Sequence, residues 1–155
     1  MDEFACRATL RGSEPAGAGQ RLVWQAAARL DHIAAAGDYT VYGVGDRSVL
    51  LVRADCATVR AYRNVCPHRG TALGRGSGRF AGGQITCAFH GWRWDLHGKN
   101  PYVPEPFRNG RPDRGVGLRE IQSVVSAGVV FIHMAADPQP SDESIAAIRK
   151  CIEGI

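Results

Sequence analysis

The sequence predicts an all-β domain with mainly antiparallel strands. Short stretches of alternating or apolar residues, rich in Val, Ile, Thr and Tyr, recur between turn-forming residues, which is typical of half-buried strands. Nineteen glycines and eight prolines in 155 residues indicate a fold with many loops. With 45% apolar residues, a chain of this length can bury one adequate core, but not two large ones.

The first half of the chain predicts an arm followed by three strands. Residues 1–20 are rich in Gly, Ala and polar groups, and we expect them to form a flexible N-terminal arm. The domain itself is expected to span residues 21–137. Its first strands are predicted at 39–44, 48–53 and 58–65, separated by Gly-Asp and Asp-Cys turns.

The second half predicts two hairpins and a helix. Short strands are expected at 84–86 and 92–96, with a turn at 97–100, and longer strands at 118–126 and 129–134, paired about Ala127-Gly128. Residues 138–155 are expected to form a short C-terminal helix. Ile145, Ile148 and Ile152 have helical spacing, and Ser141 is suited to the N-cap.

Two short clips of cysteine and histidine indicate the chemistry of the chain. The first is Cys66-x-His68 and the second is Cys87-x-x-His90. In tight loops, both spacings allow the two side chains of a clip to point toward one concave site. Two thiolates and two imidazoles can hold one binuclear iron–sulfur cluster, with the thiolates on one iron and the imidazoles on the other. This division is the Rieske arrangement, in which two histidines replace two cysteines on one iron.

The clips are predicted to lie in two cluster-binding loops, 66–70 and 87–92. The segment between the clips is rich in glycine: Gly70, Gly74, Gly76, Gly78, Gly82 and Gly83. Glycine permits positive φ and close backbone approach, so backbone amides are free to point at cluster sulfurs. Trp92 and Trp94 are expected to pack beneath the second loop and to shield the cluster from water.

A zinc site is the minor alternative for the same residues. A Cys2His2 zinc site also uses two thiolates and two imidazoles at short spacings. Zinc fingers, however, usually pair Cys with Cys and His with His, whereas each clip here mixes the two types. The other cysteines, Cys6, Cys56 and Cys151, are odd in number and dispersed, which argues against a disulfide framework.

Charge and hydropathy exclude several other classes of protein. The net charge of +4 is modest and the arginines are scattered, so nucleic-acid binding is not predicted. No apolar run approaches the length of a membrane helix, and the start of the chain lacks the plan of a signal peptide. We therefore expect no membrane association and a cytoplasmic location. A basic face would suit an acidic redox partner, because opposite charges speed encounter.

Two runs of sequence resemble a known family. Residues 64–73 and 84–96, which contain the clips, are similar to the Rieske domain of aromatic ring-hydroxylating oxygenase alpha subunits, and the similarity extends over residues 21–137. The resemblance implies a Rieske-type iron–sulfur fold with a 2Fe-2S cluster. It places Cys66 and Cys87 on the buried iron, and His68 and His90 on the outer iron.

The resemblance also implies a function. We expect one-electron transfer in an oxygenase-type system, with a flavin reductase or a ferredoxin as donor and a mononuclear-iron oxygenase domain or subunit as acceptor. The Asp/Glu-x-x-His-x-x-x-x-His pattern of that catalytic domain does not follow the Rieske region. We therefore expect an oxidoreductase component that does not catalyse oxygenation by itself. A free-standing Rieske ferredoxin, feeding a separate terminal oxygenase, is the alternative.

Overall fold

The computed structural model describes residues 24–99, 102–104, 116–134, 146 and 150. Its elements in chain order are β1 (Gln25–Arg29), η2 (Leu30–Ile33), β2 (Asp38–Val44), β3 (Arg47–Arg53), β4 (Val59–Arg63), β5 (Ser77–Arg79), η3 (Ala81–Gly83), β6 (Gln84–Thr86), β7 (Arg93–Asp95), β8 (Glu120–Ser126) and β9 (Val129–His133). Seven strands form one sheet in the order β1-β9-β8-β4-β3-β2-β5, and β6 and β7 form a separate hairpin. Every pairing between these strands is antiparallel, which confirms the predicted fold class.

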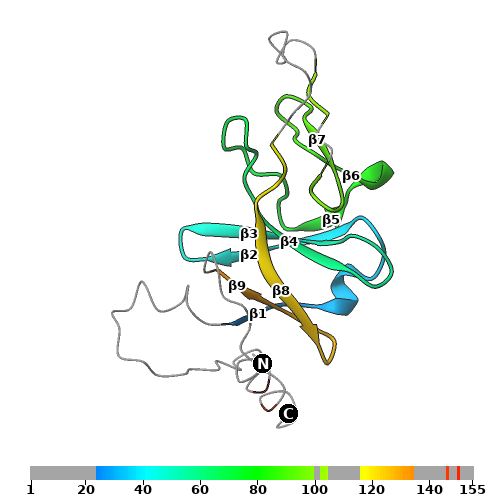
Figure 1. Ribbon diagram of the computed structural model, residues 1–155, viewed down its shortest axis with the longest axis vertical. Helices are drawn as coiled ribbons and strands as arrows, with labels where there is room; N and C mark the ends of the chain where they lie inside the picture. Colours follow the sequence, from blue (N-terminus) through cyan, green and yellow to red (C-terminus); the bar gives the residue numbers. More distant parts are fainter. Residues whose placement is uncertain (1–23, 100–101, 105–115, 135–145, 147–149, 151–155) are drawn as a thin grey trace.

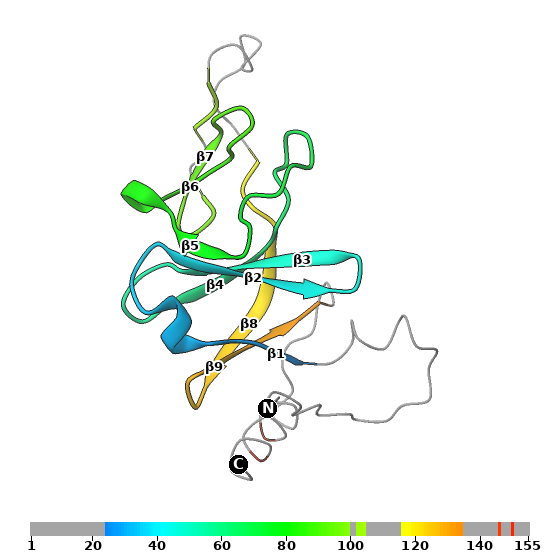
Figure 2. The same cartoon turned by 180° about the vertical axis from the view of Figure 1, so that it is seen from behind.

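Strand β3 divides the core into two layers. Because side chains alternate along a strand, Leu50 and Val52 face the β6–β7 hairpin, while Val49 and Leu51 face β8 and β9. All four side chains are fully buried. The hairpin and its loops stand on one side of β2, β3 and β4, and β1, β8 and β9 lie on the other (Figure 1), as the view from behind also shows (Figure 2). The single core expected from composition is therefore split by the sheet.

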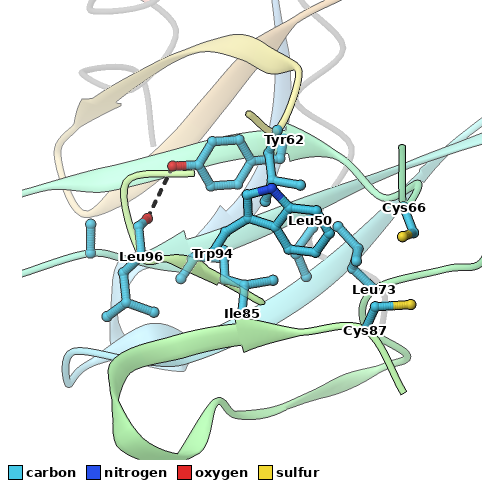
Figure 3. Packing of buried hydrophobic residues seen from close by; sticks show 11 residues of the cluster. Leu50, Tyr62, Cys66, Leu73, Ile85, Cys87, Trp94 and Leu96 are labelled. Atoms are coloured by element: carbon cyan, nitrogen blue, oxygen red, sulfur yellow. Dashed lines mark hydrogen bonds between the residues drawn. The ribbon is translucent and has the colours of Figure 1, made fainter. Parts of the chain in front are cut away.

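The upper core, between the sheet and the β6–β7 hairpin, is the layer that supports the clips. Ile85 and Trp94 are paired across the hairpin, and both are buried against Leu50 (Figure 3). The Tyr62 hydroxyl of β4 donates a hydrogen bond to the Leu96 carbonyl at 3.0 Å. This bond joins residues 34 apart in the sequence, so it fastens the hairpin to the sheet.

Most strands lie where the sequence predicts them, and the exceptions have physical reasons. The first strand, β1, was not predicted because its sequence, Gln-Ala-Ala-Ala-Arg, has low β propensity; its pairing with β9 stabilises it. The short strand β5 is exposed along its length, so it carries no apolar pattern. The strand expected at 58–65 is shorter than predicted and ends at Arg63. The turn at Ala127-Gly128 is confirmed, with φ values of 44° and 76°.

Two predicted segments fall outside the described residues. The N-terminal arm, 1–20, lies entirely outside them, as does most of the C-terminal helix, 138–155. Within that second segment Ala146 and Lys150 are described, and both are helical. In the described part of the chain, no helix is long and apolar enough to span a membrane.

Gly98 provides a test of how the hairpin is fastened. Its φ is +72°, and a Cβ at this position would lie 2.7 Å from the Tyr62 ring. We expect Gly98→Ala to lower the free energy of unfolding by about 3 kcal/mol, from left-handed strain plus displacement of a buried ring. Gly45→Ala is the matched control, because Gly45 also has positive φ (+59°) but its Cβ would meet nothing within 4 Å. Equal losses in chemical denaturation of the two variants would contradict this account.

The ion pair between Asp38 and Arg79 should make the free energy of unfolding depend on pH. Arg79 Nε donates to one carboxylate oxygen at 2.6 Å, and the Ala35 amide donates to the other at 2.9 Å. Both hydrogen bonds hold the pKa of Asp38 below its ordinary value, and the bond from Arg79 has the larger effect. A carboxyl with a depressed folded-state pKa stabilises the fold above its unfolded pKa, and this stabilisation is lost as pH falls. We therefore expect the free energy of unfolding to drop below about pH 4, and less steeply in Asp38→Asn, when both are measured by urea denaturation. Superimposable pH profiles would show that the pair contributes nothing.

Candidate metal centre

The loop after β4 is closed by two backbone hydrogen bonds. The Cys66 amide donates to the Thr71 carbonyl at 2.7 Å, and the Gly70 amide donates to the Cys66 carbonyl at 2.9 Å. Gly70 has a φ of +76°, a conformation that L-residues rarely adopt. The closure turns the chain back on itself, with Cys66 in the core and His68 at its rim.

The loop between β6 and β7 repeats the same closure. The Cys87 amide donates to the Trp92 carbonyl at 2.8 Å, and the Gly91 amide donates to the Cys87 carbonyl at 3.0 Å. Gly91 has a φ of +70°. Because the two closures are equivalent, clips with different spacing can present a cysteine and a histidine in the same way.

Asn64 holds the first loop to the sheet, a role that the sequence did not reveal. The buried side chain takes part in four hydrogen bonds: its Oδ1 accepts from the amides of Leu73 and Gly74, both at 2.9 Å, and its Nδ2 donates to the Gly74 carbonyl at 2.9 Å and to Ser48 Oγ at 3.2 Å. An asparagine just before a loop has the same sequence signature as any turn residue. Only the burial of its side chain distinguishes Asn64 from an ordinary turn residue.

The two clip cysteines lie together at one end of the upper core. Each is 2% exposed, and both sulfur atoms are visible at the edge of the cluster in Figure 3. Burial raises the pKa of the Cys66 thiol, and its interactions with Cys87 also raise it. The backbone amides of His68 and Arg69 form hydrogen bonds to the same sulfur and lower that pKa.

The two clip histidines form a second pair. Their Nδ1 atoms are 3.2 Å apart, and their ring centroids are 4.8 Å apart in an edge arrangement. Both rings are partly buried, unlike the cysteines. Burial lowers the pKa of His90, and the positive charges of His68 and Arg69 lower it further. The two loops therefore bring the predicted site residues together as two like pairs, Cys66 with Cys87 and His68 with His90.

Two tryptophans pack around this site in different ways. Trp94 is 1% exposed and its Nε1 donates to the Val116 carbonyl at 3.0 Å, so it lies beneath the loops as predicted. Trp92 lies instead against the first loop, where its ring stacks on His68 with centroids 4.9 Å apart and planes 9° apart. The Trp92 Nε1 atom is buried and has no hydrogen-bond partner within the described chain.

The residues fit a two-iron cluster better than a single zinc ion. A tetrahedral zinc site needs its ligands to converge on one point. In the part of the chain that the structure describes, no three His, Cys, Asp or Glu side chains are placed to hold one metal ion. A buried thiol pair beside a partly buried imidazole pair is instead the donor set of a Rieske cluster. Amides on sulfur and the unpaired Trp92 N–H supply donors for an acceptor-rich group.

Comparison with known proteins identifies the family. Residues 23–118 match the model of the Rieske [2Fe-2S] domain. The chain belongs to this family, and its cofactor is a Rieske-type 2Fe-2S cluster.

Several relatives of this chain are oxygenase subunits. The carnitine monooxygenase oxygenase subunit of Escherichia coli is 35% identical over 113 residues, which cover 72% of this chain and 30% of that protein. The glycine betaine monooxygenase oxygenase subunit of Chromohalobacter salexigens is 28% identical over 117 residues, which cover 75% of this chain and 26% of that protein. The chain thus spans about a quarter to a third of the length of such relatives.

Solved structures agree with this assignment. A quaternary ammonium Rieske monooxygenase in complex with L-carnitine has a TM-score of 0.72 and 25% identity, over 86% of this chain and 38% of that chain. Naphthalene 1,2-dioxygenase has a TM-score of 0.67 and 25% identity, over 77% of this chain and 28% of that chain. The predicted homology to oxygenase alpha subunits is confirmed, and it includes monooxygenases as well as a dioxygenase.

Proposed function

We propose that the chain transfers one electron at a time within a Rieske oxygenase system, with Cys66 and Cys87 on one iron and His68 and His90 on the other. When bound, the 2Fe-2S cluster supplies a one-electron redox couple. The observation that carries this proposal is the sorting of the four side chains into a buried thiol pair and a partly buried imidazole pair.

The burial of each pair gives it a different role. The thiols are surrounded by the upper core, including Leu73 and Trp94, so water is excluded from that end of the site. The imidazoles are nearer to solvent, and the Phe89 ring, 59% exposed, lies 4.0 Å from the His90 ring. A redox partner would therefore approach from the histidine side, because electron transfer favours the shortest path to the surface.

The partners and the substrate follow from the relatives. We propose a flavin reductase or a ferredoxin as electron donor and a mononuclear-iron oxygenase domain or subunit as acceptor, in the cytoplasm. That the relatives above are oxygenase subunits favours this role over a free-standing ferredoxin. Naphthalene dioxygenase supports an aromatic substrate for the system. The carnitine and glycine betaine monooxygenases favour a second candidate, the oxidation of quaternary ammonium compounds.

Metal analysis tests the proposal directly. Protein purified without oxygen is expected to contain about two irons and two acid-labile sulfides per chain. After reduction with dithionite, its EPR spectrum should have the low average g value of a histidine-ligated cluster. Zinc in place of iron, or a folded protein without metal, would rule out electron transfer by these residues.

A further inference from the structure

Trp92 connects the two loops of the metal centre. Its backbone belongs to the second loop, where its carbonyl accepts a hydrogen bond from the Cys87 amide at 2.8 Å. Its side chain reaches the first loop and stacks on His68, with ring centroids 4.9 Å apart and an interplanar angle of 9°. A nearly parallel stack against a ring anchored in the other loop restricts the rotation of the His68 imidazole.

The indole N–H of Trp92 lacks a partner where one is expected. Trp94, two residues further on, donates its own N–H to the Val116 carbonyl at 3.0 Å. The Trp92 Nε1 atom is equally excluded from solvent, but no described residue accepts from it. A buried donor that forms no hydrogen bond destabilises the fold, because its hydration is lost and nothing replaces it. The Trp92 N–H lies beside a site for an acceptor-rich group. Its lack of a partner is explained if it forms its hydrogen bond only when that group is bound.

We propose that Trp92 is a positioning residue of the metal centre, whose ring fixes the plane of His68 and whose indole N–H donates a hydrogen bond to the bound iron–sulfur group. The inference rests on the proposed ligand assignment. Reduction adds negative charge to the bound group, and a hydrogen-bond donor stabilises the more negative state. The Trp92 N–H should therefore raise the reduction potential.

Three variants separate the ring from its N–H. Trp92→Phe keeps an aromatic ring against His68 but removes the donor. Trp92→Ala removes both. Trp24→Phe is the matched control, because Trp24 contacts a different histidine, His133 of β9, with ring centroids 5.3 Å apart. For each protein we would measure iron and sulfide content, the midpoint potential by redox titration, and the EPR g values of the reduced form.

We expect Trp92→Phe to keep the wild-type content of iron and sulfide, with a midpoint potential shifted to a lower value and altered g values. Trp92→Ala should lose its cluster during purification, and Trp24→Phe should match wild type in all three measurements. A loaded Trp92→Phe protein with the potential of Trp24→Phe would overturn the inference while leaving the proposed function intact. A wild-type protein without iron and sulfide would overturn both.

A measurement on wild-type protein does not depend on how the variants fold. With tryptophan labelled by nitrogen-15 in the indole ring, pulsed EPR of the reduced protein should detect a coupling from the labelled nitrogen to the cluster. The same labelling of Trp24→Phe should preserve the coupling. No nitrogen-15 coupling in loaded wild-type protein would overturn the proposed hydrogen bond.

Discussion

Replacing Asn64 by alanine is expected to lower the free energy of unfolding by about 3–4 kcal/mol, because it leaves several buried polar groups without partners. The amides of Leu73 and Gly74 would lose their acceptor, Asn64 Oδ1, and the Gly74 carbonyl would lose its donor. The same change releases the segment that follows the first clip from the sheet. We therefore also expect a several-fold faster loss of the cluster, followed by its visible absorbance after addition of a chelator.

Two further variants show which part of Asn64 matters. Ser48→Ala removes one partner of the Asn64 amide and leaves its bonds to Leu73 and Gly74 intact, so it should cost no more than about 1 kcal/mol. Asn64→Asp keeps an acceptor for the amides of Leu73 and Gly74 but removes the two hydrogen bonds that Asn64 Nδ2 donates. Its loss in the free energy of unfolding should therefore lie between the losses of Ser48→Ala and Asn64→Ala. If Asn64→Ala were no more harmful than Ser48→Ala, Asn64 would not hold the loop.

The parts of the fold that could be predicted are those with a local signal. Strand β3 carries four consecutive apolar residues between arginines, and the hairpin of β8 and β9 has a turn at Ala127-Gly128. Strand β1 has no such signal, because alanines form a strand here only through pairing with β9. The division of the core by β3 was equally hidden, since it depends on which strands lie on each side of the sheet.

The same distinction applies to the site. The four clip residues could be proposed as ligands from the sequence because cysteine and histidine at this characteristic spacing are the donor types of a Rieske cluster. Asn64 was not, because its four hydrogen bonds exist only after β4, the loop and Ser48 have come together. The stack of Trp92 on His68 likewise joins two loops that the sequence separates. Supporting contacts of this kind depend on the three-dimensional fold, whereas candidate ligands can be recognised from residue type and spacing.

Removing a clip cysteine or a clip histidine is expected to abolish cluster binding in either case, but with different consequences for the fold. Cys66 and Cys87 are each 2% exposed and belong to the upper core. Serine in place of either puts a hydroxyl into an apolar site, at a cost of about 1–3 kcal/mol if it finds no partner. The histidines stand at the rim of the site, partly exposed. His90→Ala should therefore change the stability of the metal-free protein by no more than about 1 kcal/mol.

The comparison must be made between metal-free proteins, because a bound cluster stabilises whichever variant retains it. Urea denaturation of Cys87→Ser, His90→Ala and wild type, each stripped of iron, measures the contribution of the side chain alone. Cys56→Ser is the control for the chemical change, since Cys56 is an exposed free cysteine, and it should behave as wild type in both stability and iron content. Equal stability of metal-free Cys87→Ser and His90→Ala would mean that the thiols do not contribute to the core. Full iron and sulfide content in either variant would remove that residue from the ligand set, whatever its effect on folding.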